Sequence, residues 1–543
     1  EISAAVLCVI GTWFRFNIIY LAGGFLLFIL IVEIVMVWKN ETDHRRFWLK
    51  MRKIISAGLL LILVVTGCKL FDDYSYNKDP EYKYFKEYSE ARAAIVDASD
   101  YGYEAYAVGG CVRDSLLGRT PQDWDITTSA RPEQVKALFR HTIDTGIQHG
   151  TVTVMLDHEG FEVTTYRIDG EYEDARHPKE VAFTANLLED LKRRDFTINA
   201  LAISLNQENY GVLIDPFGGL QHLEERLIKT PLEPGLTFSD DPLRMMRAIR
   251  FASQLNFQIE ENTFQAIAEY RHRLPIVSME RIMDEFNKIM LSPEPSRGIR
   301  LLDEAGLLEI FFPELTALKG VDRVQGVKHK DNFYHTLTVL DTLSLYSQDL
   351  WLRWAALLHD IGKPATKKYI QGQGWTFYGH NHVGERLVGK IFNRLKLPQN
   401  EKMKYVQKLV GLHMRPIVIA DDVVTDSAVR RLLFEAGDDI DDLMTLCEAD
   451  ITSKNMERKQ RFLNNFQLVR QKLKDLEERD RIRNFQPPVS GEEIMKTFNL
   501  PPCRQVGALK SAIKDAILDG VIPNDYEAAR AFMLQRAEKM GLK

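Results

Sequence analysis

The chain has 543 residues, of which 45% are hydrophobic and 27% are charged, and its formal net charge is −6. Its length predicts several domains, because a single hydrophobic core rarely grows past ~250–300 residues. The slightly negative net charge shows no overall preference for nucleic acids, so any site for a polyanion must be a local patch. The five cysteines lack CxxC or CxxH spacing, which argues against a disulfide framework and against a cysteine zinc site.

Residues 1–70 form a hydrophobic N-terminal extension. Residues 16–38 are apolar except for Asn17 and Glu33, long enough to cross a hydrocarbon core of roughly 30 Å. Residues 51–68, MRKIISAGLLLILVVTGC, resemble a bacterial lipoprotein signal peptide in which Cys68 would be lipidated. The basic loop between the two segments would stay cytoplasmic and send everything after Cys68 outside. A misassigned start or a joined upstream frame is the alternative, and membrane association is therefore doubtful.

After a linker rich in Tyr, Asp and Lys, an α/β pattern begins. It predicts a helix over 90–102, an apolar strand over 103–110, a short helix over 111–118 and a strand beginning at 123. Residues 150–157 and 160–169 alternate like an antiparallel hairpin. Beyond Asp215 the pattern is almost wholly helical. The predicted fold class is α+β, a small mixed sheet with helices followed by an extended all-helical body.

Two aspartates stand at alternate positions in the stretch DWDIT. Side chains at i and i+2 of a strand point the same way, so Asp123 and Asp125 are expected to project from one face. Neighbouring carboxylates repel unless a cation lies between them. Mg²⁺ is the expected ion, because it binds one or two carboxylates together with substrate phosphates. Glu162, in a neighbouring strand, is expected as a third carboxylate.

The stretch GGCVRD precedes this pair. Gly109 and Gly110 let backbone N–H groups approach phosphate oxygens without an intervening Cβ, and the Arg113–Asp114 pair adds a cationic fork. Combined with the aspartates, the stretch predicts a nucleotide-binding site for a triphosphate.

Five motifs follow one another in the sequence: GGCVRD…DWDIT, RRDFTINALA, DPFGGLQHL, DDPLRMMRAIRFA and ERIMDEF. In this order they resemble bacterial class II tRNA nucleotidyltransferases, the CCA-adding enzymes, and their poly(A) polymerase relatives. The resemblance covers roughly residues 85–543. It implies template-independent addition of CMP, CMP and AMP to the 3′ end of tRNA from CTP and ATP. It also implies that Asp123 and Asp125 are catalytic and hold two Mg²⁺ ions.

The same resemblance implies further nucleotide-binding residues. Arg194, Asp195 and Asn199 would lie near the sugar and phosphates of the incoming nucleotide. Arg247 would continue a basic stripe that meets phosphate or packs.

Asp241 and Arg244 stand at i and i+3 and are expected to share one helix face. One acceptor and one donor fork can match the edge of cytosine or adenine, but not guanine or uracil equally well. The family element E-D-x-x-R has Glu where this chain has Asp240, a mild departure because the reading role falls on the other two positions.

A second constellation lies in the helical body, where LLHDIGKP resembles the HD metal-dependent phosphohydrolase domain. Imidazole and carboxylate suit Ni²⁺, Co²⁺, Mn²⁺ or Mg²⁺, and the metal would make a hydroxide for attack on a phosphoester. A scaffold without hydrolysis is the alternative. His382 is interpreted as a bystander. The expected ligands are His335, His359, Asp360, His380, His413 and Asp450.

These patterns predict a domain order, and a basic helical stretch over 452–485 is the expected contact for the tRNA acceptor arm. The domains are an extension at 1–70, a linker at 71–85, a nucleotidyltransferase head at 86–230, a nucleobase-recognition and RNA-binding neck at 231–320, an HD domain at 321–452 and a helical tRNA-binding region at 453–543.

Four alternatives stay open. One is a poly(A) polymerase, and another adds only CC or only A, with determinants in a loop between 169 and 192. The third is an HD phosphohydrolase whose head is an inactive RNA-binding module. The fourth is a surface lipoprotein with a degenerate enzyme body. Because CTP, ATP and tRNA are cytosolic, the predicted location is the cytoplasm, and no protein partner is implied.

Overall fold

The computed structural model describes residues 102–156, 159–169, 181–184, 186–324, 327–328, 331–421, 425–452, 455–480, 482–483 and 485–542. The predictions for the extension, the linker, the helix at 90–102 and most of the loop between 169 and 192 lie outside these ranges. Within them, no helix combines the length and apolar character that a membrane span requires.

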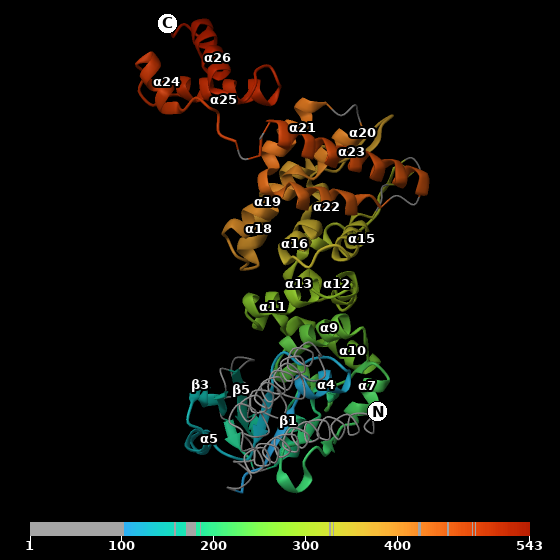
Figure 1. The fold of residues 1–543 in the computed structure, drawn as a ribbon. Helices are drawn as coiled ribbons and strands as arrows, with labels where there is room; N and C mark the ends of the chain where they lie inside the picture. Colours follow the sequence, from blue (N-terminus) through green and yellow to red (C-terminus); the bar gives the residue numbers. More distant parts are fainter. Residues whose placement is uncertain are drawn as a thin grey trace, which may run out of the picture. The chain divides into compact units, whose positions relative to one another are not determined.

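The chain separates into two compact units (Figure 1). Among the described residues, the first unit contains 102–147, Thr151–Thr164 and Ile203–Val212, and the second contains Gln148–Gly150, Thr165–Ala202 and those from Leu213 onward.

A seven-stranded sheet with strand order β3-β4-β5-β2-β1-β8-β9 confirms the predicted sheet. In the hairpin β4–β5, Val154 lies opposite Phe161 and Val152 opposite Val163, and all four are buried. This alternation of buried residues is the pattern that predicted the hairpin. The strands are β1 (Ala105–Val108), β2 (Asp125–Thr128), β3 (Thr142–Gly146), β4 (Thr151–Leu156), β5 (Glu159–Thr165), β8 (Ala202–Ser204) and β9 (Leu213–Ile214).

Short helices and small strands accompany the sheet. Helix α4 (Gly110–Leu116) connects β1 to β2 and α5 (Pro132–Leu138) connects β2 to β3, while α6 (Leu187–Lys192) and α7 (Gly219–Glu224) come later in the chain. The small strands pair as β6 (Arg167–Asp169) with β7 (Val181–Phe183), and β10 (Leu227–Ile228) with β11 (Gln258–Ile259).

The helical body confirms the prediction for the second half of the chain. Its first helices are α8 (Pro234–Asp240), α9 (Leu243–Leu255), α10 (Glu261–Tyr270), α11 (Met279–Met290), α12 (Pro295–Glu304), α13 (Leu308–Phe311) and α14 (Pro313–Thr316). Next come α15 (Asn332–Ser344), α16 (Leu350–Leu358), α17 (Lys363–Thr366), α18 (His380–Arg394), α19 (Glu401–Leu412), α20 (Met414–Asp421), α21 (Asp426–Ala436) and α22 (Ile440–Asp450). The last are α23 (Met456–Asp480), α24 (Gly491–Phe498), α25 (Arg504–Leu518) and α26 (Tyr526–Lys539).

Two neighbouring residues anchor the buried face of α16. Trp354 of this helix packs into an aromatic cluster with Phe286 and Phe312, whose ring centroids lie 5.6–6.1 Å apart. The fully buried Arg353 donates to the carbonyls of Met290 at 2.7 Å and Ser292 at 3.0 Å, and also to carbonyls that follow α15. A cation at these helix C-termini is favourable, because the last carbonyls of a helix lack partners of their own.

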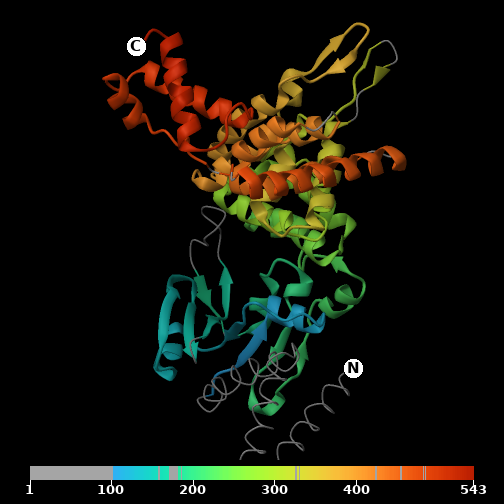
Figure 2. The same ribbon diagram turned by 45° about the horizontal axis from the view of Figure 1, so that its top comes forward.

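Two small hairpins interrupt the helical body, and the periodicity of the sequence had not indicated them. They consist of β12 (Arg323–Val324) with β13 (Val327–Lys328), and β14 (Lys368–Ile370) with β15 (Gly374–Thr376). Strand β13 packs beside β15, and both hairpins are drawn in yellow at the upper right of Figure 2.

Candidate functional sites

Three carboxylates gather on the sheet of the first unit. Strand β2 begins at Asp125, and Asp123 lies in the bend just before it. Asp123 is exposed, Asp125 is half-buried, and Trp124 between them is buried, so the two acids lie on the side opposite the indole. Glu162 lies on β5, the strand next to β2. The expected alternation is therefore present, although it starts one step ahead of the strand.

The pKa of Glu162 responds to the charges of the other two acids. Burial raises the pKa of Glu162, and the negative charges of Asp125 and Asp123 raise it further. Such mutual repulsion is what a divalent cation would relieve, and oxygen ligands of this kind suit a hard cation whose remaining positions are filled by water or phosphate. These residues fit a metal-binding role.

The glycine turn before α4 has the backbone that its residues predict. Gly109 has φ 84°, a conformation that favours glycine, and it directly precedes the helix. Arg113 is buried, and its guanidinium contacts Asp114 through Nε at 2.8 Å and Nη2 at 2.9 Å. Contact of Gly109, Gly110, Arg113 and Asp114 with a nucleotide stays a prediction.

The RRDFTIN stretch forms a network of buried charges in the second unit. The buried Asp190 pairs with Arg193 at 2.7 Å and lies 3.7 Å from Arg194. Asp195 accepts hydrogen bonds from Asn199 Nδ2 at 3.0 Å and from Arg247 Nε at 2.7 Å. Burial works to raise the pKa of Asp195, but Arg247 and Asn199 outweigh it and hold the pKa at about 2.

The helix-face prediction for Asp241 and Arg244 is wrong in its local geometry. Helix α8 ends at Asp240 and α9 begins at Leu243, so Asp241 lies at the junction and not within a helix. The Asp241 carboxylate accepts from Leu243 N at 3.0 Å and lies 3.5 Å from Arg281 Nη2. Pro242, which follows Asp241, disfavours the helical conformation at that position. Arg244 donates from Nη2 to the carbonyl of Arg193 at 2.8 Å.

One buried ion pair was not predicted from the sequence. Arg250 Nε lies 2.6 Å from Glu285 Oε2, and Glu285 is only 4% exposed. The motif ERIMDEF contained the signal, since an acid flanked by apolar residues at helical spacing is expected to need a buried cation.

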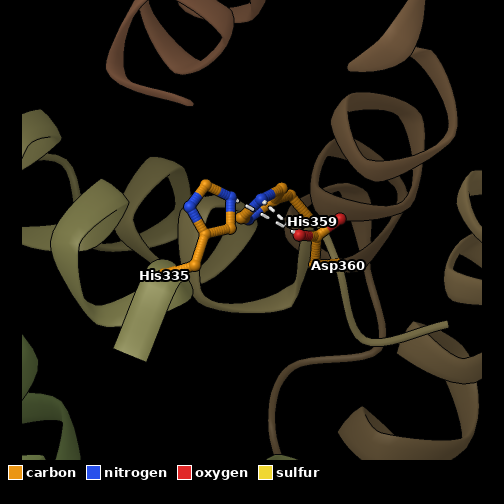
Figure 3. A group of neighbouring side chains, drawn as sticks. All are labelled: His335, His359 and Asp360. Carbon is orange, nitrogen blue, oxygen red and sulfur yellow. Dashed lines mark ion pairs between the residues drawn. The ribbon is translucent and has the colours of Figure 1, made fainter. Parts of the chain in front are cut away.

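The second candidate site is a cluster of histidines and aspartates in the helical body (Figure 3). Asp360 Oδ2 lies 3.2 Å from His359 Nε2 and 3.6 Å from His335 Nε2, while Asp360 Oδ1 lies 3.3 Å from His380 Nε2. Asp450, at the end of α22, lies 2.9 Å from His335 Nε2. These residues come from the ends of α15, α16, α18 and α22, so only the packing of the helices brings them together.

The sixth residue of the cluster is His413, between α19 and α20. Its Nε2 lies 4.0 Å from Asp360 Oδ1 and 3.2 Å from His380 Nε2. Two groups of three within the cluster have ligand atoms all within 4.8 Å of one another. Two imidazole nitrogens that face each other at this distance repel unless a proton or a cation lies between them.

The Nδ1 atoms of the histidines contact groups on the side of each ring that faces away from the cluster. Carbonyl oxygens lie 2.7 Å from Nδ1 of His359, 2.7 Å from Nδ1 of His413 and 2.9 Å from Nδ1 of His380. A carbonyl can only accept, so each Nδ1 carries a proton and each Nε2 faces the cluster. His335 Nδ1 lies 3.0 Å from Thr452 Oγ1. Outer contacts of this kind orient the histidine ligands of metal ions.

The pKa values of two histidines in the cluster are shifted in opposite directions. Burial acts to lower the pKa of His359, but Asp360 and then Asp450 outweigh it and raise the pKa to about 9. Burial and the charge of His359 lower the pKa of His413 to about 4. Two aspartates surrounded by four imidazoles form a ligand set that suits a divalent cation. His382 is exposed and outside the cluster, in agreement with its interpretation as a bystander.

Comparison with family models divides the described chain into three matches. The poly(A) polymerase head domain matches residues 105–229, and the probable RNA and SrmB-binding site of polymerase A matches residues 256–319. The HD domain matches residues 332–455.

Similar proteins span most of the chain. A CCA-adding enzyme of Enterococcus faecalis is 32% identical over 455 residues, which cover 83% of this chain and 97% of that protein. A CCA-adding enzyme of Anoxybacillus flavithermus is 43% identical over 277 residues, which cover 50% of this chain and 65% of that protein. The crystal structure of a Bacillus stearothermophilus CCA-adding enzyme in complex with CTP has a TM-score of 0.61 and 29% identity, covering 86% of this chain and 99% of that chain.

Proposed function

The chain belongs to the family of CCA-adding enzymes, and we propose that it adds CMP, CMP and AMP in turn to the 3′ end of tRNA. The substrates are CTP and ATP, the released product is pyrophosphate, and no nucleic-acid template is used. The observation that carries this proposal is the gathering of Asp123, Asp125 and Glu162 at one sheet, where burial and then the charges of Asp125 and Asp123 raise the pKa of Glu162.

In the proposed reaction the RNA supplies its own nucleophile, the terminal 3′-hydroxyl. Asp123 and Asp125, together with Glu162, would hold two Mg²⁺ ions. When bound, these ions lower the pKa of the hydroxyl and neutralise charge on the α-phosphate and the departing pyrophosphate. The turn at Gly109 and Gly110 leaves backbone N–H groups accessible to phosphate oxygens.

Selection of the base is assigned to Asp241 and Arg244. In the described chain the Asp241 carboxylate caps α9, and Arg244 donates to a carbonyl of the RRDFTIN stretch. Both groups therefore have partners in the resting protein. An incoming cytosine or adenine would exchange these contacts for hydrogen bonds to its own edge, with little net cost, whereas guanine and uracil would leave a donor or acceptor unpaired. Arg194, Asp195, Asn199 and Arg247 are proposed to bind the sugar and phosphates of the incoming nucleotide.

The histidine–aspartate cluster is proposed as a second metal site. The observation that favours it is the inward direction of Nε2 in His359, His380 and His413, fixed by carbonyls behind each ring. Mixed imidazole and carboxylate ligands suit Ni²⁺, Co²⁺, Mn²⁺ or Mg²⁺. A bound ion would supply a hydroxide for hydrolysis of a phosphoester.

The direct test is incorporation of radiolabelled CTP and ATP by the protein into tRNA that lacks its last three nucleotides. Products that stop after C, C and A support the proposal. A long adenylate tail would indicate a poly(A) polymerase, and a product ending after CC, or formed only from tRNA that already ends in CC, would indicate partial addition. Because CTP, ATP and tRNA are cytosolic, the cytoplasm is the proposed location.

A further inference from the structure

The hairpin β14–β15 lies in the chain between the two halves of the histidine–aspartate cluster. It is preceded by Asp360 on one side and followed by His380 on the other. The connecting stretch, KPATKKYIQGQGWTFYG, contains three lysines and four aromatic residues and no acidic residue. In a chain whose formal net charge is −6, this is a local positive segment.

The register of the hairpin places its aromatic residues on one face. Tyr369 lies directly opposite Trp375, and their ring centroids are 5.4 Å apart. Phe377 follows Trp375 by two positions and therefore continues on the same side. All three rings are half-buried, so each retains surface that a base could cover.

Lysines alternate with these rings along the same face. The ammonium of Lys367 lies 5.1 Å from the centroid of Trp375, and that of Lys363 lies 5.6 Å from the centroid of Phe377. Lys367 also pairs with Asp322, whose side chain is 57% exposed. An exposed ion pair is worth little, so a phosphate can replace this carboxylate at small cost.

The row of lysines and rings ends at the cluster. Lys363 Nζ lies 2.5 Å from Asp360 Oδ2, the same oxygen that faces His335 and His359. At the other end of the hairpin, the carbonyl of Phe377 lies 2.9 Å from Nδ1 of His380. The segment from Lys363 to Phe377, which contains the hairpin, therefore contacts the candidate metal site at both of its ends.

We propose that the surface formed by Lys363 of α17, by Tyr369 and Trp375 of the hairpin, and by Lys367 and Phe377, which flank its strands, binds single-stranded RNA and leads its backbone to the histidine–aspartate cluster. Alternating cations and aromatic rings fit this partner, since phosphates pair with the ammonium groups and bases stack on the rings. Lys368 is exposed on the opposite side of the register and lies outside this surface. The inference is independent of nucleotidyl transfer by the head and concerns binding only.

The test uses the full chain, a fluorescein-labelled oligouridylate of about eight nucleotides and saturating CTP to occupy the head. Anisotropy titrations over a range of salt concentrations give both affinity and the number of phosphate contacts. For the first hairpin variant, Lys367→Gln, we expect at least fivefold weaker binding. We also expect the slope of log K against log salt to fall by ~0.7, the contribution of one single-strand phosphate contact.

The matched control is Lys402→Gln/Lys404→Gln, which removes two exposed lysines from α19. Trp375→Leu is expected to weaken binding at least fivefold through lost stacking. Thermal unfolding shows whether the two hairpin variants, Lys367→Gln and Trp375→Leu, are folded. Lys368→Gln, on the opposite side of the register, is a second control and is expected to leave the affinity and the salt slope close to those of the parent chain.

Amide hydrogen exchange, measured with and without the oligonucleotide, locates the binding site. Slower exchange of residues 366–378 in the presence of the oligonucleotide supports the proposal. The proposal is overturned if affinity and salt slope are the same in the hairpin variants as in the parent chain. It is also overturned if the α19 control loses as much, if protection occurs only elsewhere, or if UMP competes as well as the oligonucleotide. Metal binding to the cluster is measured separately by calorimetry. A negative result there would contradict the proposed metal site but not the RNA-binding surface.

Discussion

Arg247 Nη2 lies 2.6 Å from Asp195 Oδ2, and this ion pair joins α9 to the RRDFTIN stretch. Asp195 is 7% exposed, whereas the Arg247 side chain is 35% exposed, so water reaches the cation but hardly the anion. The pair therefore connects two motifs that are separate in the sequence, one assigned to the nucleotide phosphates and one to the base.

The Asp195 carboxylate is expected to make stability depend on pH. Its pKa falls from 3.8 to about 2 on folding, so it stabilises the protein fully above pH 4 and loses this contribution as the pH falls toward 2. The contribution is about 2 kcal/mol. Urea unfolding between pH 5 and 3 should show a shallower loss of stability for Asp195→Asn than for the parent. Equal slopes would contradict the assignment, and Asp144→Asn, at an exposed position, is the control.

Asp125→Asn and Asp123→Asn are expected to lower CTP incorporation by at least a thousandfold. Either change removes a carboxylate from the proposed Mg²⁺ site and leaves the buried Trp124 between them in place. Single-turnover incorporation into tRNA lacking CCA measures the loss, and thermal unfolding tests the fold. Asp144→Asn should retain full activity. Substantial incorporation by either aspartate variant would remove that residue from the catalytic assignment.

Arg244→Ala is expected to lose nucleotide choice more than rate. Without the guanidinium, uracil and guanine no longer leave a donor unpaired, so UMP or GMP should enter the product. Sequencing of extended tRNA ends measures the misincorporation, with Arg300→Ala as a control for loss of an exposed arginine that pairs with Glu294. Unchanged selectivity, together with a fall in rate alone, would indicate that Arg244 supports the stretch around Arg193 and does not read the base.

His380→Ala is expected to abolish binding of Mn²⁺ or Ni²⁺ to the cluster, whereas His382→Ala is expected to leave it intact. The two histidines are two positions apart, but one is buried in the cluster and the other is exposed. Thr452→Ala, which removes the contact behind His335, should weaken metal binding about 10- to 100-fold. Calorimetric titration measures all three. Equal metal binding by the parent and His380→Ala would exclude the proposed site.

Patterns of short range were predictable from the sequence because each depends on the periodicity of one element. The hairpin β4–β5, the long helix α23 and the alternation of Asp123 and Asp125 around Trp124 are of this kind. Asp241 shows the limit of such reasoning. Its spacing from Arg244 fits a helix face, but Pro242 ends the helix before it, and the steric effect of one residue outweighs the spacing.

The sequence by itself determined the order of the motifs, the family and the residue types available for metal and phosphate. Only the tertiary structure decided which of them meet. Asp450 reaches His335 at 2.9 Å across the helical body, and Arg250 finds Glu285, through contacts between elements far apart in the chain. Such contacts depend on how whole helices pack, a property that no local periodicity encodes.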